Sequence, residues 1–376
     1  MSKEDKRRIA VAILPWVNLS QDIQIGPITL WSWDPSKIQD VEIKNQLEHF
    51  FKIFVDRYGK IVTTIAICSH GKPDFHILEE KEYNELQAAI NILAFSSICP
   101  EVKRGVCSNN NSIAPPNAEH FEFFGQKFTI PDDGAIVIST RNSMSWDLLD
   151  KIHISKPWGV YSSCPIRPNE ELIGAFNLLF NDSLNIEVRE RIFRSLEWFR
   201  FAHTEGNNVS DDSRLIMMST AFEILLDFPE REKSIYFAKQ IESKLKKDKS
   251  ISETRTYNNK QYTYTKAACW AYDFYQLRSK IVHGDLFRPE DGLYKDWINY
   301  NIVADLVFWE LVVKELFEKG CLGERARKWA EEFRPHVKDN DNLEEFFLDW
   351  YMGFDDYHRA LGWMEPLTSK SQIKEI

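Results

Sequence analysis

Two residues whose side chains could cleave a phosphodiester lie close together late in the chain. Arg278 precedes His283 by five positions. Histidine titrates near neutrality, so it can take a proton from a ribose 2′-hydroxyl or give one to a leaving oxygen. Arginine keeps its charge and can hold phosphate oxygens in a two-pronged fork while negative charge builds up. The pair suits metal-independent cleavage of RNA through the neighbouring 2′-hydroxyl.

The residues around the pair have both a functional and a structural interpretation. His283 could simply be a cation favoured at a helix C-terminus, with Arg278 in a salt bridge. Lys280 could contact phosphate or be a solvated helix residue, and Ser279 could hydrogen-bond to the substrate. Glu223 lies on an apolar helix earlier in the chain, where it could anchor Arg278 or His283 or simply lie at the helix edge.

The element that must position the pair is a long helix predicted over residues 263–283 and ended by Gly284. On an ideal helix, five residues turn through about 140°. Arg278 and His283 therefore do not share one stripe of the helix. A loosened last turn, or a second copy of the helix facing the first, could bring both side chains to one groove.

The rest of the chain is predicted to be α+β. Strands are expected at 9–14, 23–33, 60–68, 121–130 and 135–140, and helices at 41–58 and 81–97, the second closed before Pro100. After residue 165, helices are expected at 186–204, 213–228, 231–247 and 296–319, with a polar loop at 248–262. We expect a mixed α/β sensor or regulatory domain (1–165), an all-α bundle (166–323) and a helical tail (324–376) that packs on the body.

Composition narrows the class of protein. Of the 376 residues, 43% are hydrophobic, which is typical of a globular chain. The net charge of −10 argues against a protein that coats nucleic acid, because such binding relies on cations that neutralise phosphates. The six scattered cysteines and the lack of a long apolar run favour a soluble cytoplasmic protein with reduced thiols. No glycine-rich phosphate loop is present, and no cofactor is expected.

The segment Arg278-Ser-Lys-Ile-Val-His283 resembles the hallmark of the HEPN superfamily: an arginine, four to six arbitrary residues and a histidine, late in a helix of a small bundle. The earlier apolar segment 213–226, with its Ala-Phe-Glu-Ile-Leu-Leu stretch, is similar to the first core helix of the Apea-like HEPN group. The resemblance covers about residues 186–320.

The resemblance implies a helical bundle that forms a homodimer, with the Arg278 and His283 pairs of both copies facing a shared cleft. It implies an endoribonuclease that leaves a 2′,3′-cyclic phosphate. Members often act in prokaryotic antiviral defence, as abortive-infection effectors or toxins, which would add a phage-derived or host trigger or an antitoxin as a partner. Many active members carry Asn, Asp or His where this chain has Ser279. The alternative is therefore an inactive HEPN-like scaffold that binds nucleotide, RNA or protein.

Two further motifs have competing interpretations. Cys68, His70 and His76 form a loose cluster, but a zinc site usually needs four ligands with tighter spacing, so we expect no metal. The basic run 244–249 could steer RNA, although lysines at a helix end also suit the helix dipole.

Overall fold

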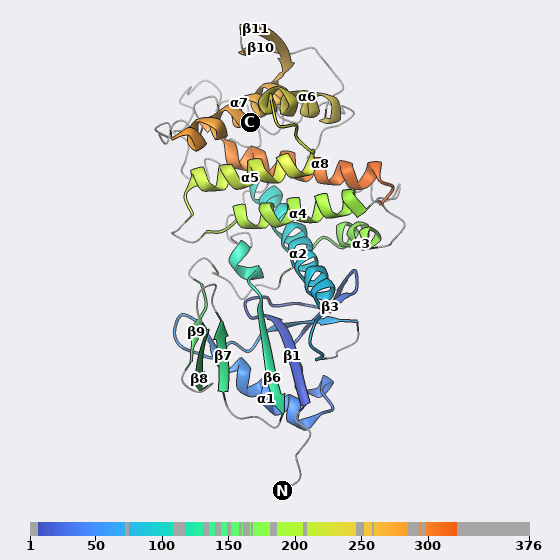
Figure 1. Ribbon diagram of the computed structural model, residues 1–376, viewed down its shortest axis with the longest axis vertical. Coiled ribbons are helices and arrows are strands. Elements are labelled where there is room, and N and C mark those ends of the chain that lie inside the picture. Colours follow the sequence, from blue (N-terminus) through green and yellow to red (C-terminus); the bar gives the residue numbers. More distant parts are fainter. Residues whose placement is uncertain are drawn as a thin grey trace, which may run out of the picture. The chain divides into compact units, whose positions relative to one another are not determined.

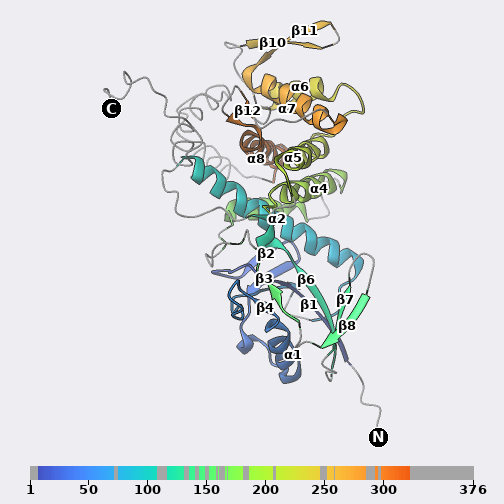
Figure 2. The ribbon, with the colours of Figure 1, turned by 90° about the vertical axis from the view of Figure 1, so that its left-hand side faces the viewer.

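The computed structural model describes residues 7–71, 75–107, 117–130, 135–139, 144–148, 152–157, 160, 166, 168–180, 186–205, 209–245, 252–257, 259–284, 293–294 and 298–321. They divide into two compact units. The first takes the described residues of Met1–Ser97, Pro116–Asn181 and His203–Asn207, and the second those of Ile98–Pro115, Asp182–Ala202 and Asn208–Ile376 (Figures 1 and 2). The expected tail, 324–376, lies outside the described residues.

The first unit contains a five-stranded sheet in the order β2-β3-β5-β1-β6, in which every neighbouring pair is antiparallel. Its strands are β1 (Arg7–Leu14), β2 (Ile23–Ile25), β3 (Ile28–Ser32), β5 (Ala66–His70) and β6 (Phe124–Ile130). β1 is central, with Ala12 opposite Cys68 on one side and Gly125 on the other. The expected strand 23–33 is divided into β2 and β3 by a turn at Gly26, which has a φ of 56°.

Helix α1 (Val41–Phe51) supplies the apolar residues that pack with one face of this sheet. Asp40 caps the helix, because its carboxylate accepts the backbone N–H groups of Glu42 and Ile43. The shared core contains Ile13, Trp31, Leu47, Phe50, Ile67 and Phe128. The helix expected to reach residue 58 ends at Phe51, because Phe54 and Val55 form strand β4 (Phe54–Val55), which pairs in parallel with β9 (Ile154–Ser155).

Several further elements complete this part of the chain, and α2 has residues in both units, since those from Ile98 on belong to the second. They are η1 (Pro35–Lys37), α2 (Glu80–Cys107), η2 (Ala118–Phe121), the antiparallel pair β7 (Ala135–Ser139) and β8 (Met144–Leu148), and α3 (Glu170–Leu179). The expected end of α2 before Pro100 is wrong, since the helix continues to Cys107. α3 belongs to the first unit, whereas the sequence placed everything after residue 165 in the helical domain.

The second unit is mainly helical. Its helices are α4 (Ile186–Ala202), α5 (Asp211–Leu225), α6 (Lys233–Leu245), α7 (Lys266–His283) and α8 (Tyr300–Glu318). α4 and α5 run side by side (Figure 1), as do α6 and α7. Aromatic rings fill the core: Phe222 contacts Phe237, Phe274 and Phe308, with ring centroids 4.8, 5.8 and 5.5 Å away. These contacts join α5, α6, α7 and α8 around one side chain.

The second unit is not all-α, which corrects the sequence prediction. The expected polar loop 248–262 contains the hairpin β10 (Ser252–Tyr257) and β11 (Lys260–Thr265). Tyr264 is buried against Ala268, Cys269 and Tyr272 of α7. A short antiparallel pair, β12 (Leu293–Tyr294) and β13 (Ile298–Asn299), precedes α8. The described chain as a whole is therefore a mixed α/β protein.

Candidate functional site

Helix α7 carries both residues that the sequence singled out. It begins after Thr265, whose side chain accepts the N–H of Ala268, and ends at His283. Gly284 follows in the left-handed conformation with a φ of 82°, and its N–H donates to the carbonyls of Ile281 and Lys280. Such a glycine cap satisfies carbonyls that the helix end leaves unpaired. The predicted end of this helix at His283 is confirmed.

Arg278 lies at the margin of the helical core. Its neighbour Leu277 is buried, whereas the Arg278 side chain is 25% exposed. One guanidinium nitrogen, Nη2, lies 3.6 Å from Oε1 of Glu223 on α5. The guanidinium carbon lies 5.5 Å from the centroid of the Tyr275 ring, close enough for a cation–π contact. The anchoring role that the sequence allowed for Glu223 therefore has a geometric basis for Arg278.

The Glu223 carboxylate has two further partners. The hydroxyl of Tyr275 donates to its Oε1 at 2.6 Å, and the ammonium of Lys233 on α6 contacts its Oε2. Burial, together with the hydrogen bond to Glu223, raises the pKa of Tyr275, so its hydroxyl keeps the proton that it donates. Glu223, Lys233, Tyr275 and Arg278 form a group that we call the Glu223 cluster. Sequence reasoning did not single out Lys233 or Tyr275.

His283 stands apart from this cluster. It is exposed, as is Lys280, and Ser279 is half-buried. No hydrogen bond or ion pair joins Arg278 to His283 within the part of the chain that the structure describes. Because α7 stays helical through His283, the last turn does not loosen to bring the two side chains together. One copy of the chain thus offers a guanidinium and an imidazole on different sides of the same helix end.

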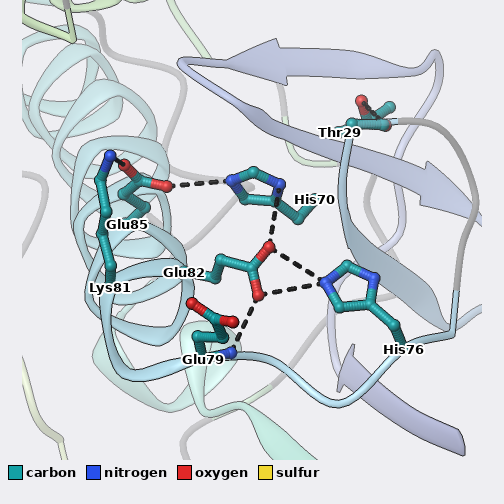
Figure 3. Close-up of polar contacts among 8 residues, drawn as sticks. Thr29, His70, His76, Glu79, Lys81, Glu82 and Glu85 are labelled. Atoms are coloured by element: carbon teal, nitrogen blue, oxygen red, sulfur yellow. Dashed lines mark hydrogen bonds and ion pairs between the residues drawn. The ribbon is translucent and has the colours of Figure 1, made fainter.

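A second group of titratable residues joins strand β5 to the start of α2 in the first unit (Figure 3). Nε2 of His76 lies 3.0 Å from the Glu82 carboxylate. His70 faces two carboxylates, with Nδ1 3.5 Å from Glu82 and Nε2 3.0 Å from Glu85. We call His70, His76, Glu82 and Glu85 the Glu82 cluster. The backbone N–H of Glu79 and then the side chain of His76 lower the pKa of Glu82, so its carboxylate is held in the ionised form.

Cys68 has no place in that cluster, although the sequence grouped it with His70 and His76. It is buried, and burial raises the pKa of its thiol to about 12. Within the described ranges, no group of three or more His, Cys, Asp or Glu side chains is arranged to hold a metal ion. Sequence reasoning missed Glu82 and Glu85, whose three-residue spacing places them on one face of α2.

The basic run 244–249 begins with Lys244, which forms ion pairs within its own chain. Burial alone would lower the pKa of Lys244, but hydrogen bonds to Glu315 and Glu318 raise it. Its ammonium lies 2.7 Å from Glu315 and 3.2 Å from Glu318, both on α8. Lys244 therefore joins α6 to α8. Residues 246–249 lie outside the described residues.

No helix in the described ranges combines the length and the apolar character that a membrane span requires. Comparison of the chain with models of protein families, with curated proteins and with solved structures finds no match.

Proposed function

We propose that this chain is a metal-independent endoribonuclease of the HEPN type in which Arg278 and His283 do the chemistry. The observation that carries the proposal is the capped end of α7. There a half-buried guanidinium is held against a carboxylate, and an exposed imidazole follows on the last helical residue. The proposal includes an HEPN-like bundle built on α5 and α7.

The two side chains have complementary roles in the proposed reaction. His283 takes the proton from a ribose 2′-hydroxyl, whose oxygen then attacks the adjacent phosphorus. The bond from phosphorus to the 5′-oxygen breaks, and that oxygen takes a proton from a protonated His283, which leaves a 2′,3′-cyclic phosphate and a 5′-hydroxyl. Arg278 binds the phosphate oxygens on which charge builds up. The exposed Lys280 and the neighbouring Ser279 lie beside the pair and would bind the RNA backbone.

A second copy of the chain completes the proposed site. Because Arg278 and His283 point about 140° apart on α7, one helix does not direct both at the same phosphate. A twofold axis beside the helix ends would set the arginine of one copy against the histidine of its partner. The proposed active form is therefore a homodimer, with RNA as its substrate.

The cellular role that we propose is antiviral defence by abortive infection, or a toxin restrained by an antitoxin. In this proposal the first unit senses a phage-derived or host trigger, and the protein acts in the cytoplasm. The role rests on the resemblance of the α7 motif to the HEPN superfamily rather than on a feature of the fold.

A binding scaffold is the second candidate, and one contact favours it. Arg278 already lies 3.6 Å from Glu223 within its own chain, an arrangement that a purely structural salt bridge would also produce. Ser279, where many active members carry Asn, Asp or His, points the same way. Such a scaffold would bind RNA, nucleotide or protein without cleaving RNA.

Cleavage of total RNA in EDTA separates the two candidates. We expect the wild-type protein to cut RNA and to leave 2′,3′-cyclic phosphate ends. Arg278→Ala and His283→Ala should each lower the rate roughly a thousandfold, the order that a charge-stabilising donor and a general acid–base group respectively contribute. Arg255→Ala is the matched control, because Arg255 pairs with Asp273 rather than with the Glu223 cluster. Cleavage that survives both site substitutions would exclude the proposal, whereas RNA binding without cleavage by any form would favour the scaffold.

Mixing the two inactive variants tests the twofold arrangement. An Arg278→Ala chain paired with a His283→Ala chain contains one intact site if the arginine and histidine come from different copies. Random exchange of subunits should then restore about a quarter of the wild-type activity, since half of the dimers carry one of two sites. A mixture that stays inactive after subunit exchange would place both residues of each site on the same chain.

A further inference from the structure

The Glu223 carboxylate divides its contacts unequally among its three partners. The Tyr275 hydroxyl donates at 2.6 Å and the Lys233 ammonium is in direct contact, whereas Nη2 of Arg278 lies 3.6 Å away. The carboxylate is therefore fixed mainly by Tyr275 and Lys233. Arg278 is oriented by that fixed carboxylate, and the Tyr275 ring lies 5.5 Å from its guanidinium carbon. Three helices contribute to this arrangement, since the partners come from α5, α6 and α7.

The charges in the cluster leave Arg278 able to bind an anion. One carboxylate faces two cations, so the charge of Lys233 balances that of Glu223 and the charge of Arg278 is left over. The contact with Glu223 also leaves part of the Arg278 side chain accessible, since 25% of it is exposed, although its Nε is buried and has no hydrogen-bond partner among the described residues. An arginine has five N–H donors in a rigid fork, and a bound phosphate oxygen would use those that the carboxylate leaves.

We infer that Glu223 is a positioning residue for Arg278 and that Tyr275 and Lys233 hold Glu223 in place. This inference rests on the proposed endoribonuclease function, in which Arg278 binds the phosphate in the transition state. Glu223 touches neither RNA nor the reacting atoms. It limits the rotamers of a long side chain, so less conformational entropy is lost when the phosphate is bound. Groups that support a reacting side chain in this way typically contribute roughly ten- to a hundredfold to activity.

The first test measures the freedom of Arg278 without using RNA. Butanedione adds to guanidinium groups that are free of ion pairs, and peptide mass spectrometry gives the rate at Arg278 alone. We expect Glu223→Gln to raise this rate severalfold and Tyr275→Phe to raise it less. Asp273→Asn is the matched control. It removes a carboxylate from α7, the helix that carries Arg278, but this carboxylate pairs with Arg255 at 2.7 Å. An unchanged rate in both cluster variants would overturn the inference, whatever their activity.

The second test measures RNA cleavage by the same proteins. Glu223→Gln should lower kcat roughly tenfold or more and change KM less than about threefold, because the orientation of Arg278 matters most in the transition state. Tyr275→Phe keeps the ring and the fold, so it tests the inference if Glu223→Gln does not fold. Faster modification with an unchanged kcat would overturn the positioning role. Faster modification in a protein that cleaves no RNA in any form would overturn the proposed function and leave the assignment of Glu223 to Arg278 intact.

Discussion

The Glu82 and Glu223 clusters differ in their cations more than in their burial. The Glu82 and Glu223 side chains are 20% and 17% exposed, and each faces two basic residues on neighbouring segments. Around Glu82 both are histidines, His70 and His76. Around Glu223 they are lysine and arginine, and the arginine can hold a carboxylate in a two-pronged fork. The two carboxylates are therefore similarly exposed but have different kinds of basic partner.

The two clusters also differ in how much the fold depends on them. Glu223 draws together three helices of the second unit, and its Tyr275 partner is buried. Glu82 instead joins the end of β5 to the first turn of α2, and its partner His76 is 37% exposed. A carboxylate that accepts a hydrogen bond from a buried donor is the more costly one to remove, because water cannot replace it at that donor.

Stability should show the largest difference between the clusters. At pH 7 we expect Glu223→Gln to lower the free energy of unfolding by about 1–3 kcal/mol, because Lys233 loses its charged partner and Tyr275 its charged acceptor. Glu82→Gln should cost less than about 1 kcal/mol, as is usual for partly exposed ion pairs. Urea denaturation of both variants measures the two values. Equal losses of unfolding free energy would contradict the prediction, because they would mean that the difference in partners does not affect stability.

The pH dependence of Glu82 should show the next largest effect. Its pKa is lowered in the folded protein, so its ionised form stabilises the fold above the pKa of the unfolded chain. The contribution should be present in full above about pH 5 and lost as the pH falls toward 3. The difference in unfolding free energy between wild type and Glu82→Gln should therefore shrink over this range. A difference that stays constant from pH 7 to pH 3 would contradict the role of Glu82.

Lys280 should show the smallest effect, because it is exposed and contributes a single charge. In a His283→Ala background, which we expect to bind RNA without cutting it, Lys280→Ala should reduce the salt dependence of RNA binding by one phosphate contact. That corresponds to a change of about 0.7 in the slope of log K against log salt for single strands. Lys239→Ala, at an exposed position on α6, is the control. A slope that changes equally in both variants would remove Lys280 from the proposed RNA site.

Local signals in the sequence located the two helices that carry the candidate site and the end of α7, whereas the expected start of α7 at residue 263 is wrong because residues 263–265 belong to β11. The joint before α5 is rich in capping residues, and Ser210 there accepts the N–H of Ser213. Gly284 ends α7 in the conformation that glycine adopts most easily. Such caps involve residues only a few positions apart, so a single sequence reveals them.

The sequence did not predict which segments pair with one another or pack together in the fold. The hairpin β10–β11 was hidden by its Ser, Thr and Asn content, although its tyrosines alternate as in a half-buried strand. Its place depends on α7, where Tyr264 is buried and Arg255 pairs with Asp273. The end of α1 likewise depends on the pairing of β4 with β9, whose residues are about a hundred positions apart in the chain.

The sequence alone determined that a guanidinium and an imidazole lie five residues apart at the capped end of a helix. Helix caps and helix periodicity are local properties, so no knowledge of the fold was needed. Only the tertiary structure decided that Arg278 meets Glu223 while His283 stays exposed and apart from it. That outcome depends on how α5, α6 and α7 pack around a shared aromatic core, and packing is set by residues far apart in the chain.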